Sequence, residues 1–127
     1  MSMKPIARFT KEVIDALDLD IEEKTPIYMG ESNIEHMKQR HLKDFEKYGV
    51  CIEDILNNPE YVGRNPKDDS IEYVREYQSE CNDFVKVAVR ISLRGRYYAR
   101  SLYILKESRV RNFINKGTLK DLTKSAK

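Results

Sequence analysis

The sequence feature that most constrains the fold is an alternation of large apolar side chains with polar or small ones within residues 84–93. Every second position from Val85 to Leu93 is valine, isoleucine or leucine, and the positions between them are polar, cationic or alanine. A period of two predicts a β-strand with one buried face. Arg94-Gly95-Arg96 follows as a turn, with glycine in a left-handed position, so residues 97–105 are expected to return as the second strand of a hairpin.

The hairpin loop predicts which side chains share a face. A three-residue loop over residues 93–95 would pair Ser92 with Arg96. The pairs then expected on the buried face are Ile91 with Tyr97, Val89 with Ala99 and Val87 with Ser101. The opposite face would carry Lys86, Ala88, Arg90, Ser92, Arg96, Tyr98, Arg100 and Leu102. A register shifted by one residue would exchange the faces and turn Ser101 and Tyr103 outward.

Helical periodicity dominates the residues before this hairpin. A helix is expected over 33–48, with Ser32 and Glu35 forming a capping box and Gly49 ending it. Its apolar stripe would contain Ile34, Met37, His41, Phe45 and Tyr48. Shorter helices are expected over 10–17, 51–57 and 107–115, and short strands over 4–9, 26–30, 61–64 and 71–78.

Helices that precede a run of antiparallel strands indicate an α+β fold. We expect N-terminal helices packed on a four-stranded antiparallel meander with a C-terminal helix, so that one sheet face stays open to solvent. With 127 residues the chain has room for one domain, which we place at residues 1–122. Residues 118–127 are polar and are expected to fray, with 123–127 forming a flexible basic tail.

The net charge of +2 conceals a strong asymmetry along the chain. Residues 1–83 contain 11 lysines and arginines and 19 acids, whereas residues 84–127 contain 12 lysines and arginines and only two acids. A surface this basic attracts polyanions such as nucleic acids. The alternative is that the acidic half folds over the basic half and neutralises it. On the predicted open face, cations would surround Tyr98, a combination suited to binding phosphate and stacking on an unpaired base.

Several classes of function lack their sequence signatures. The chain has no glycine-rich phosphate loop followed by lysine and no serine or cysteine hydrolase motif. The two histidines and the two cysteines, Cys51 and Cys81, lack the spacing of a zinc site, so neither a metal nor another cofactor is expected. No segment has the pattern of a membrane helix or a signal peptide, so we expect a cytoplasmic protein with reduced cysteines and no membrane partner.

Short motifs in a fixed order extend over most of the chain, from about residue 28 to 122. They are Glu35-His36-Met37-Lys38-Gln39-Arg40-His41, Asp44-Phe45-Glu46-Lys47-Tyr48-Gly49, Ile55-Leu56-Asn57-Asn58-Pro59-Glu60-Tyr61-Val62-Gly63, Val85-Lys86-Val87-Ala88-Val89-Arg90, Arg94-Gly95-Arg96 and Arg100-Ser101-Leu102-Tyr103. With these motifs the chain resembles phage-associated nuclease-like domains that are grouped with barnase, EndoU, the tRNase colicins and RelE. The resemblance implies two N-terminal helices on a four-stranded antiparallel sheet and metal-independent RNA cleavage on the exposed sheet face. At position 101 this chain has serine where the family commonly has threonine, and serine keeps the hydroxyl.

Metal-free RNA cleavage needs a base, an acid and cations that stabilise the phosphate. His36 and Arg40 lie one helical turn apart and can reach one phosphate. His41 falls on the apolar stripe, where a core histidine is the commoner interpretation, although the resemblance implies that both histidines are functional. The candidate catalytic residues are therefore His36, Arg40, His41, Arg90, Arg100 and Ser101, and the candidate substrate-binding residues are Lys86, Arg96, Tyr98 and Arg64. The base is left open, because Glu72 and Glu76 qualify only if their strand turns them toward the open face.

The leading hypothesis is a phage- or prophage-derived endoribonuclease of the toxin type that leaves a 2′,3′-cyclic phosphate. Its expected partners are RNA, including tRNA, and an immunity or antitoxin protein. The alternative is a non-catalytic RNA-binding or protein-binding phage accessory protein on the same scaffold, which would leave RNA uncut.

Overall fold

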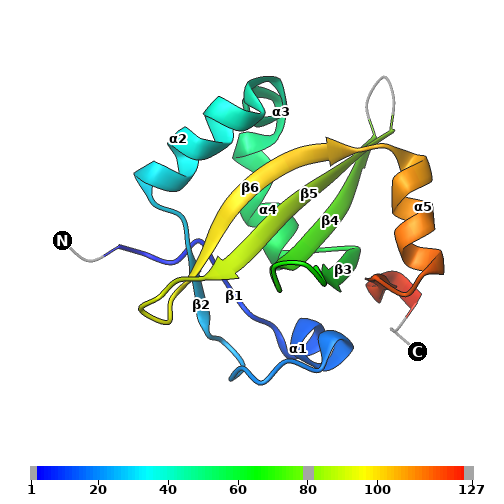
Figure 1. Cartoon of the computed structure of the whole chain (residues 1–127), viewed down its shortest axis with the longest axis horizontal. Helices are drawn as coiled ribbons and strands as arrows, with labels where there is room; N and C mark the ends of the chain where they lie inside the picture. The colour runs from blue at the N-terminus through cyan, green and yellow to red at the C-terminus, as the bar shows by residue number, and fades with distance from the viewer. Residues whose placement is uncertain (1–2, 79–81, 125–127) are drawn as a thin grey trace.

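The computed structural model describes residues 3–78 and 82–124 (Figure 1). Within these ranges the helices are α1 (Lys11–Leu17), α2 (Glu31–Arg40), α3 (Leu42–Tyr48), α4 (Ile52–Asn57) and α5 (Glu107–Asn115). The strands are β1 (Ala7–Arg8), β2 (Pro26–Tyr28), β3 (Tyr61–Arg64), β4 (Ile71–Gln78), β5 (Asn82–Ile91), β6 (Tyr97–Leu105) and β7 (Leu119–Asp121). Short 3-10 turns occupy Gly49–Cys51 and Leu122–Lys124. The structure confirms the α+β class and the bounds expected for β3, β4, β6 and α5.

The strands form one mixed sheet with the order β1-β2-β6-β5-β4-β3-β7 within the described ranges. The expected antiparallel meander is its centre, but the prediction of four strands is wrong, because β2 adds to β6 in parallel and β1 and β7 extend the two edges. β1 and β2 fall within the short strands expected over 4–9 and 26–30, but the sequence pattern did not place them in this sheet. β7 has three residues, too few to show a period in the sequence.

The segment after α5 differs from the expected frayed tail. Leu119 pairs with Gly63 of β3 and is 2% exposed, so β7 is part of the fold. Its role depends on contacts with a strand far away in the sequence, which local polarity does not reveal. Residues 125–127 of the expected flexible tail lie outside the described residues.

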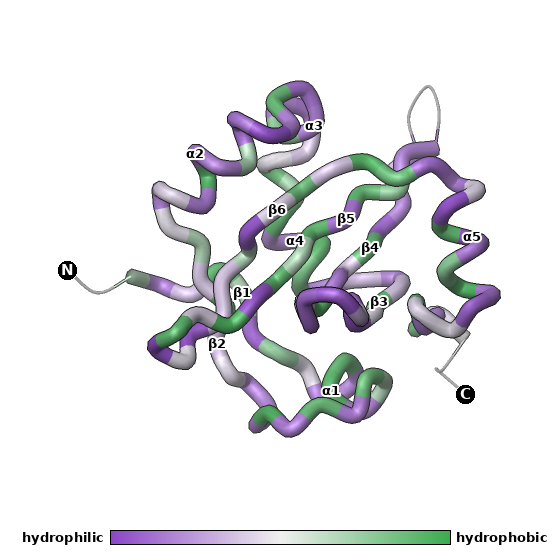
Figure 2. The backbone as a smooth tube through the Cα atoms, viewed as in Figure 1, coloured by the Kyte–Doolittle hydropathy of each residue, from purple (hydrophilic) through white to green (hydrophobic). Residues whose placement is uncertain are grey.

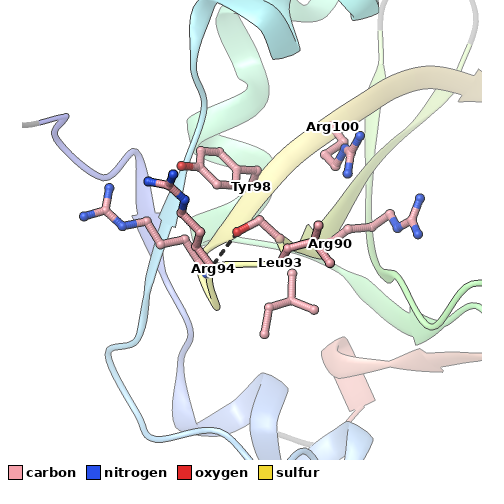
Figure 3. A pocket seen from close by; sticks show the side chains of 8 residues that line it. Arg90, Leu93, Arg94, Tyr98 and Arg100 are labelled. Carbon is pink, nitrogen blue, oxygen red and sulfur yellow. Dashed lines mark hydrogen bonds between the residues drawn. The ribbon is translucent and has the colours of Figure 1, made fainter.

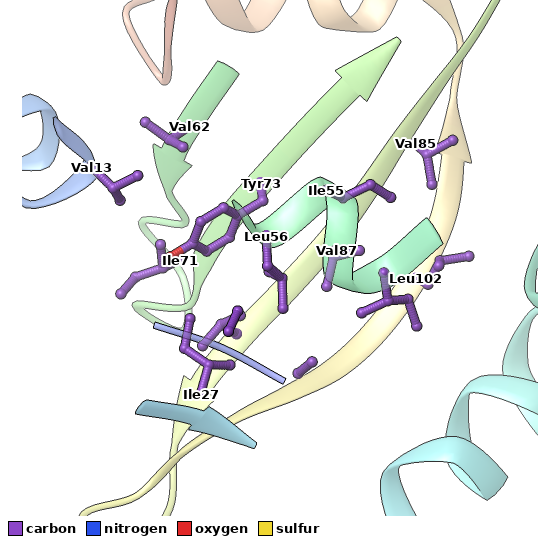
Figure 4. Close-up of a cluster of buried hydrophobic side chains, with 14 of the residues drawn as sticks. Val13, Ile27, Ile55, Leu56, Val62, Ile71, Tyr73, Val85, Val87 and Leu102 are labelled. Atoms are coloured by element: carbon purple, nitrogen blue, oxygen red, sulfur yellow. The ribbon is translucent and has the colours of Figure 1, made fainter. Parts of the chain in front are cut away.

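The main hydrophobic core lies on one face of the sheet and includes buried side chains of α1, α2 and α4 (Figure 4). Val87 and Val89 of β5 share this core with Ile55 and Leu56 of α4. On the opposite face α5 covers only one end of the sheet, where a smaller cluster contains Val74, Phe84, Leu105, Val110 and Leu119. We call the uncovered remainder of that second face the open face. Figure 2 shows hydrophobic segments recurring along β5 and β6, whereas α2 is largely hydrophilic.

The helix expected over 33–48 is broken in two at His41. The backbone of His41 has φ −146° and ψ 64°, and this residue ends α2 and precedes α3. The expected cap at Ser32 is also wrong, because α2 begins after Gly30, whose N–H donates to Asn33 Oδ1 at 2.8 Å. After the break, Asp44 Oδ2 accepts a hydrogen bond from Ile104 N at 3.0 Å, so α3 satisfies a backbone group of β6.

The β5–β6 hairpin follows the expected register only near its turn. Val89 opposes Ala99 as predicted, but Ala88 opposes Ser101, so Arg100 is an extra residue in β6. Such a β-bulge reverses the faces beyond it. The predictions that Ser101 faces the core and that Leu102 faces outward are therefore wrong, and Leu102 is fully buried in the core.

Candidate functional site

A hollow of about 760 Å³ lies at the hairpin end of the open face (Figure 3). It is lined by Arg90, Ile91, Ser92, Leu93, Arg94, Arg96, Tyr98 and Arg100, and we call it the arginine hollow. Arg90 opposes Tyr98 across β5 and β6, and Arg100 is the bulged residue. In Figure 3 the side chains of Arg90 and Arg100 extend to one side of the hairpin and that of Arg94 to the other. Of the four cations predicted around Tyr98, Arg90, Arg96 and Arg100 line the hollow with it, whereas Lys86 lies outside.

Carboxylates neutralise the arginine hollow only weakly: after hydrogen bonds from Ser70, the charge of Arg90 contributes to lowering the pKa of Asp68. Its four arginines are all exposed, and none of them forms a salt bridge with an acid of residues 3–78 or 82–124. The Arg96 guanidinium instead lies 5.0 Å from the ring centre of Tyr28, which is 6.0 Å from that of Tyr98. The acidic N-terminal half thus leaves these cations available to a polyanion.

A second group of polar side chains lies on the same face next to the arginine hollow. Lys86 Nζ donates to Glu72 Oε2 at 2.8 Å, and Asn65 Nδ2 donates to the same oxygen at 3.2 Å. Lys86 Nζ also lies 4.6 Å from the ring centre of Tyr103, and the ring of Tyr103 stacks on His41 with 5.0 Å between centres. We call Glu72, Lys86, Tyr103 and His41 the Lys86 cluster.

The strand register joins the two groups. Glu72, Ala88 and Ser101 lie opposite one another in one row across β4, β5 and β6. The row on one side of it contains Lys86 and Tyr103, and the row on the other contains Arg90 and Tyr98. Successive rows of one face therefore carry first Arg90, then the Glu72 carboxylate and the Ser101 hydroxyl, and then Lys86 and Tyr103, on whose ring His41 stacks.

The Lys86–Glu72 ion pair is buried although it belongs to the open face. The two side chains are 8% and 7% exposed. Burial by itself lowers the pKa of Lys86, but hydrogen bonds to Glu72 and Tyr103 and the charge of Glu72 outweigh it, so this pKa lies above its ordinary value. Lys86 is thus a fixed cation at neutral pH. Both hydrogen bonds to Glu72 end on Oε2, and Oε1 accepts none from the described residues, which leaves that oxygen available as a proton acceptor.

The structure places the residues predicted from sequence in two sets. Arg90, Arg96, Tyr98 and Arg100 line the arginine hollow, and Lys86, Ser101 and His41 lie on the same face beside it. The interpretation of His41 as a core histidine is wrong, because the break after α2 leaves it exposed. Of the two candidate bases, Glu72 faces the open face and pairs with Lys86.

Three candidates are not brought into this surface by any contact among the described residues. Arg64 forms an ion pair with Asp69 at 2.7 Å and lines a different hollow together with Val89 and Tyr97, which face the core side. His36 and Arg40 are exposed on α2, and neither side chain forms a hydrogen bond or an ion pair within residues 3–78 and 82–124.

Sequence reasoning missed two residues of this surface. Arg94 lines the arginine hollow, but a turn residue carries no face signal in the sequence. Tyr103 joins the Lys86 cluster because the bulge at Arg100 turns it outward. In the sequence, only a hairpin register shifted by one residue turns Tyr103 outward.

Two further properties bear on the class of site. No group of three or more His, Cys, Asp and Glu side chains within the described ranges could hold a metal ion. None of the helices in residues 3–78 and 82–124 is long and apolar enough to cross a membrane.

Comparison with known proteins identifies a family. No curated protein and no solved structure matches the chain. Residues 4–112, however, match a family model described as phage-Barnase-EndoU-ColicinE5/D-RelE like nuclease 3. The matched segment includes the β5–β6 hairpin and every residue of the Lys86 cluster and the arginine hollow. The resemblance found in the motifs is thereby confirmed, and the chain belongs to the phage Barnase-EndoU-ColicinE5/D-RelE like nuclease 3 family.

Proposed function

We propose that the protein is a metal-independent endoribonuclease of the toxin type that cuts RNA by transesterification on the open face. One observation carries the proposal: exposed, unpaired arginines around Tyr98 lie directly beside the buried Lys86–Glu72 pair. The family supports a nuclease, and the choice of RNA as substrate rests on the chemistry of this surface.

The arginine hollow fits a nucleotide of a single strand. Guanidinium groups bind phosphate oxygens in pairs, and an aromatic ring accepts a stacked base without selecting a sequence. The volume of about 760 Å³ lies within the range of small-ligand sites. Arg90 and Arg100 would contact the scissile phosphate, and Arg96 and Tyr98 the adjoining nucleotide.

The reaction needs no group beyond those of the RNA and the protein. Glu72 Oε1 takes the proton of a ribose 2′-hydroxyl, and the 2′-oxygen attacks phosphorus while the bond from phosphorus to the 5′-oxygen breaks. A histidine gives its proton to the leaving 5′-oxygen, which yields a 2′,3′-cyclic phosphate and a 5′-hydroxyl. Arg90 and Arg100 stabilise the added negative charge of the phosphorane-like transition state, and the Ser101 hydroxyl orients a phosphate oxygen.

A second function is favoured by the burial of the Lys86–Glu72 pair. In this second function the carboxylate of Glu72, neutralised by Lys86 and shielded from solvent, is a structural part of the sheet and takes no proton. The same surface would then bind RNA, or an acidic protein, without cutting it.

The test is cleavage of single-stranded RNA or tRNA in EDTA, with analysis of the product ends. The proposal predicts cyclic phosphate and 5′-hydroxyl ends, and no cleavage of an otherwise identical strand that carries 2′-deoxyribose. RNA that is bound with a steep salt dependence but stays intact would support the binding function instead.

A further inference from the structure

The stack between His41 and Tyr103 joins two segments that are distant in the sequence. His41 follows α2, and its backbone leaves the helical region, which removes its side chain from the apolar stripe. The imidazole is exposed to solvent yet stacks on Tyr103, with 5.0 Å between ring centres and 27° between ring planes. An exposed ring held in a defined orientation differs from a ring that moves freely at a helix end.

Tyr103 also contacts the charged pair beneath it. Lys86 Nζ lies 4.6 Å from the Tyr103 ring centre and 2.8 Å from Glu72 Oε2. The half-buried Tyr103 ring therefore links the exposed imidazole to the buried ion pair. No other aromatic ring within the described residues touches either histidine.

The α2–α3 segment is fixed where it meets β6. Asp44, three residues after His41, accepts the Ile104 N–H at 3.0 Å, and Phe45 N donates to His41 O at 2.9 Å. The Asp44 contact holds the start of α3 against β6, the strand that carries Ser101 and Tyr103, and the Phe45 bond joins His41 to that helix. His36 lies in the middle of α2 and has no comparable support.

From this arrangement we infer that His41, and not His36, supplies the proton in the reaction, and that Tyr103 is the positioning residue that holds the His41 imidazole beside the Lys86–Glu72 pair. The inference rests on the proposed function and assigns its proton donor, which that function left open between two histidines. The ring of Tyr103 makes the stack with His41, whereas its hydroxyl hydrogen-bonds with Lys86, so phenylalanine should keep the imidazole in place and a branched aliphatic side chain should not.

The geometric part of the inference is tested without any activity measurement. In a proton NMR spectrum, the stacked Tyr103 ring should shift the His41 imidazole resonances upfield of those of His36. The shift should persist in Tyr103→Phe and disappear in Tyr103→Leu. His41 resonances that do not move in Tyr103→Leu would overturn the stacked arrangement.

The catalytic part is tested by separating kcat from KM for RNA cleavage in EDTA. Tyr103→Leu should lower kcat about 100-fold, the size expected when a catalytic group is displaced by about 1 Å, and should leave KM within about threefold. Tyr103→Phe should keep kcat near the wild-type value. If the melting temperatures of Tyr103→Phe and Tyr103→Leu are similar, a loss of stability does not explain the difference in kcat between them. His41→Asn should lower kcat by a factor of about 100 or more, whereas His36→Asn should change it by less than about threefold.

The outcomes separate this inference from the proposed function. Unchanged kcat in Tyr103→Leu, or a larger loss in His36→Asn than in His41→Asn, would overturn the assignment while the nuclease stands. If the wild-type protein cuts no RNA, the proposed function fails and the catalytic role of Tyr103 fails with it, whatever the NMR result.

Discussion

Lys86 and Glu72 form an ion pair in which Nζ lies 2.8 Å from Oε2 and the two side chains are 8% and 7% exposed. It is the most buried of the ion pairs found in residues 3–78 and 82–124. Because the pair is buried and also belongs to the open face, it contributes both to the fold and to the proposed site.

Removing one partner should destabilise the protein strongly. Lys86→Met leaves Glu72 buried without its cation and should lower the free energy of unfolding by about 3–5 kcal/mol. Urea titration measures this loss. Lys11→Met is the matched control, because the Lys11–Asp15 pair is 70% and 64% exposed and its loss should be below about 1 kcal/mol. Equal effects of the two changes would show that burial of the Lys86–Glu72 pair has no energetic consequence.

The arginine hollow should determine how RNA binding responds to salt. Each phosphate contact that is lost lowers the slope of log K against log salt by roughly 0.7 for a single strand. Arg90→Ala with Arg100→Ala should therefore weaken binding and reduce the slope by about 1.4. The control Lys106→Ala with Arg109→Ala removes the same charge at exposed positions outside the hollow. Fluorescence anisotropy over a salt series measures the RNA affinity and the salt slope of each variant. Equal slopes for the two variants would show that RNA does not bind specifically in the arginine hollow.

Acid should destabilise the protein through Asp54. A hydrogen bond from Tyr77 at 2.6 Å, with help from Asn58 and Arg75, outweighs burial and lowers the pKa of Asp54. A carboxyl whose pKa is lower in the folded state stabilises the fold above its unfolded value of about 3.9, and this contribution is lost as the pH falls through the folded value. Asp54→Asn and Tyr77→Phe should both flatten the decline of unfolding free energy below about pH 4. If the unfolding free energy of both variants declines as steeply as that of the wild type, Asp54 does not contribute to acid destabilisation.

Gly63 should tolerate no side chain. A Cβ at this position would collide with the carbonyl oxygen of Thr118 and lie 2.9 Å from Leu119 Cδ2, where β7 pairs with β3. Gly63→Ala should therefore destabilise the protein by about 1–3 kcal/mol, because the backbone of β7 must move. Thermal unfolding checks this value. An unchanged melting temperature would mean that β7 does not pack on β3 in solution.

The parts of the fold that the sequence predicted well are those with a local signal. The alternation in residues 84–93 identified β5 and the charged face of the hairpin, because a period of two needs no knowledge of the partner strand. Thr10 likewise predicted the start of α1, where its hydroxyl accepts from Val13 N at 3.3 Å.

The features that complete the candidate site depend on contacts between distant residues. The break at His41 accompanies a contact between Asp44 and Ile104, which are 60 residues apart. The bulge at Arg100 moves Ser101 and Tyr103 onto the open face, and its only mark in the sequence is the pair of consecutive polar residues Arg100 and Ser101, which shifts the alternation by one position. Periodicity therefore located the cations but assigned His41 to the core and left Tyr103 out.

RNA cleavage in the arginine hollow is tested most directly by comparing two double variants in one assay. Wild-type protein, Arg90→Ala with Arg100→Ala, and Lys106→Ala with Arg109→Ala are incubated with single-stranded RNA in EDTA after equal stability has been verified. The wild type and the Lys106/Arg109 variant should yield cyclic-phosphate products, and the Arg90/Arg100 variant should cleave at a rate at least about 100-fold lower. Cleavage by the Arg90/Arg100 variant at the wild-type rate would contradict a catalytic site in the arginine hollow.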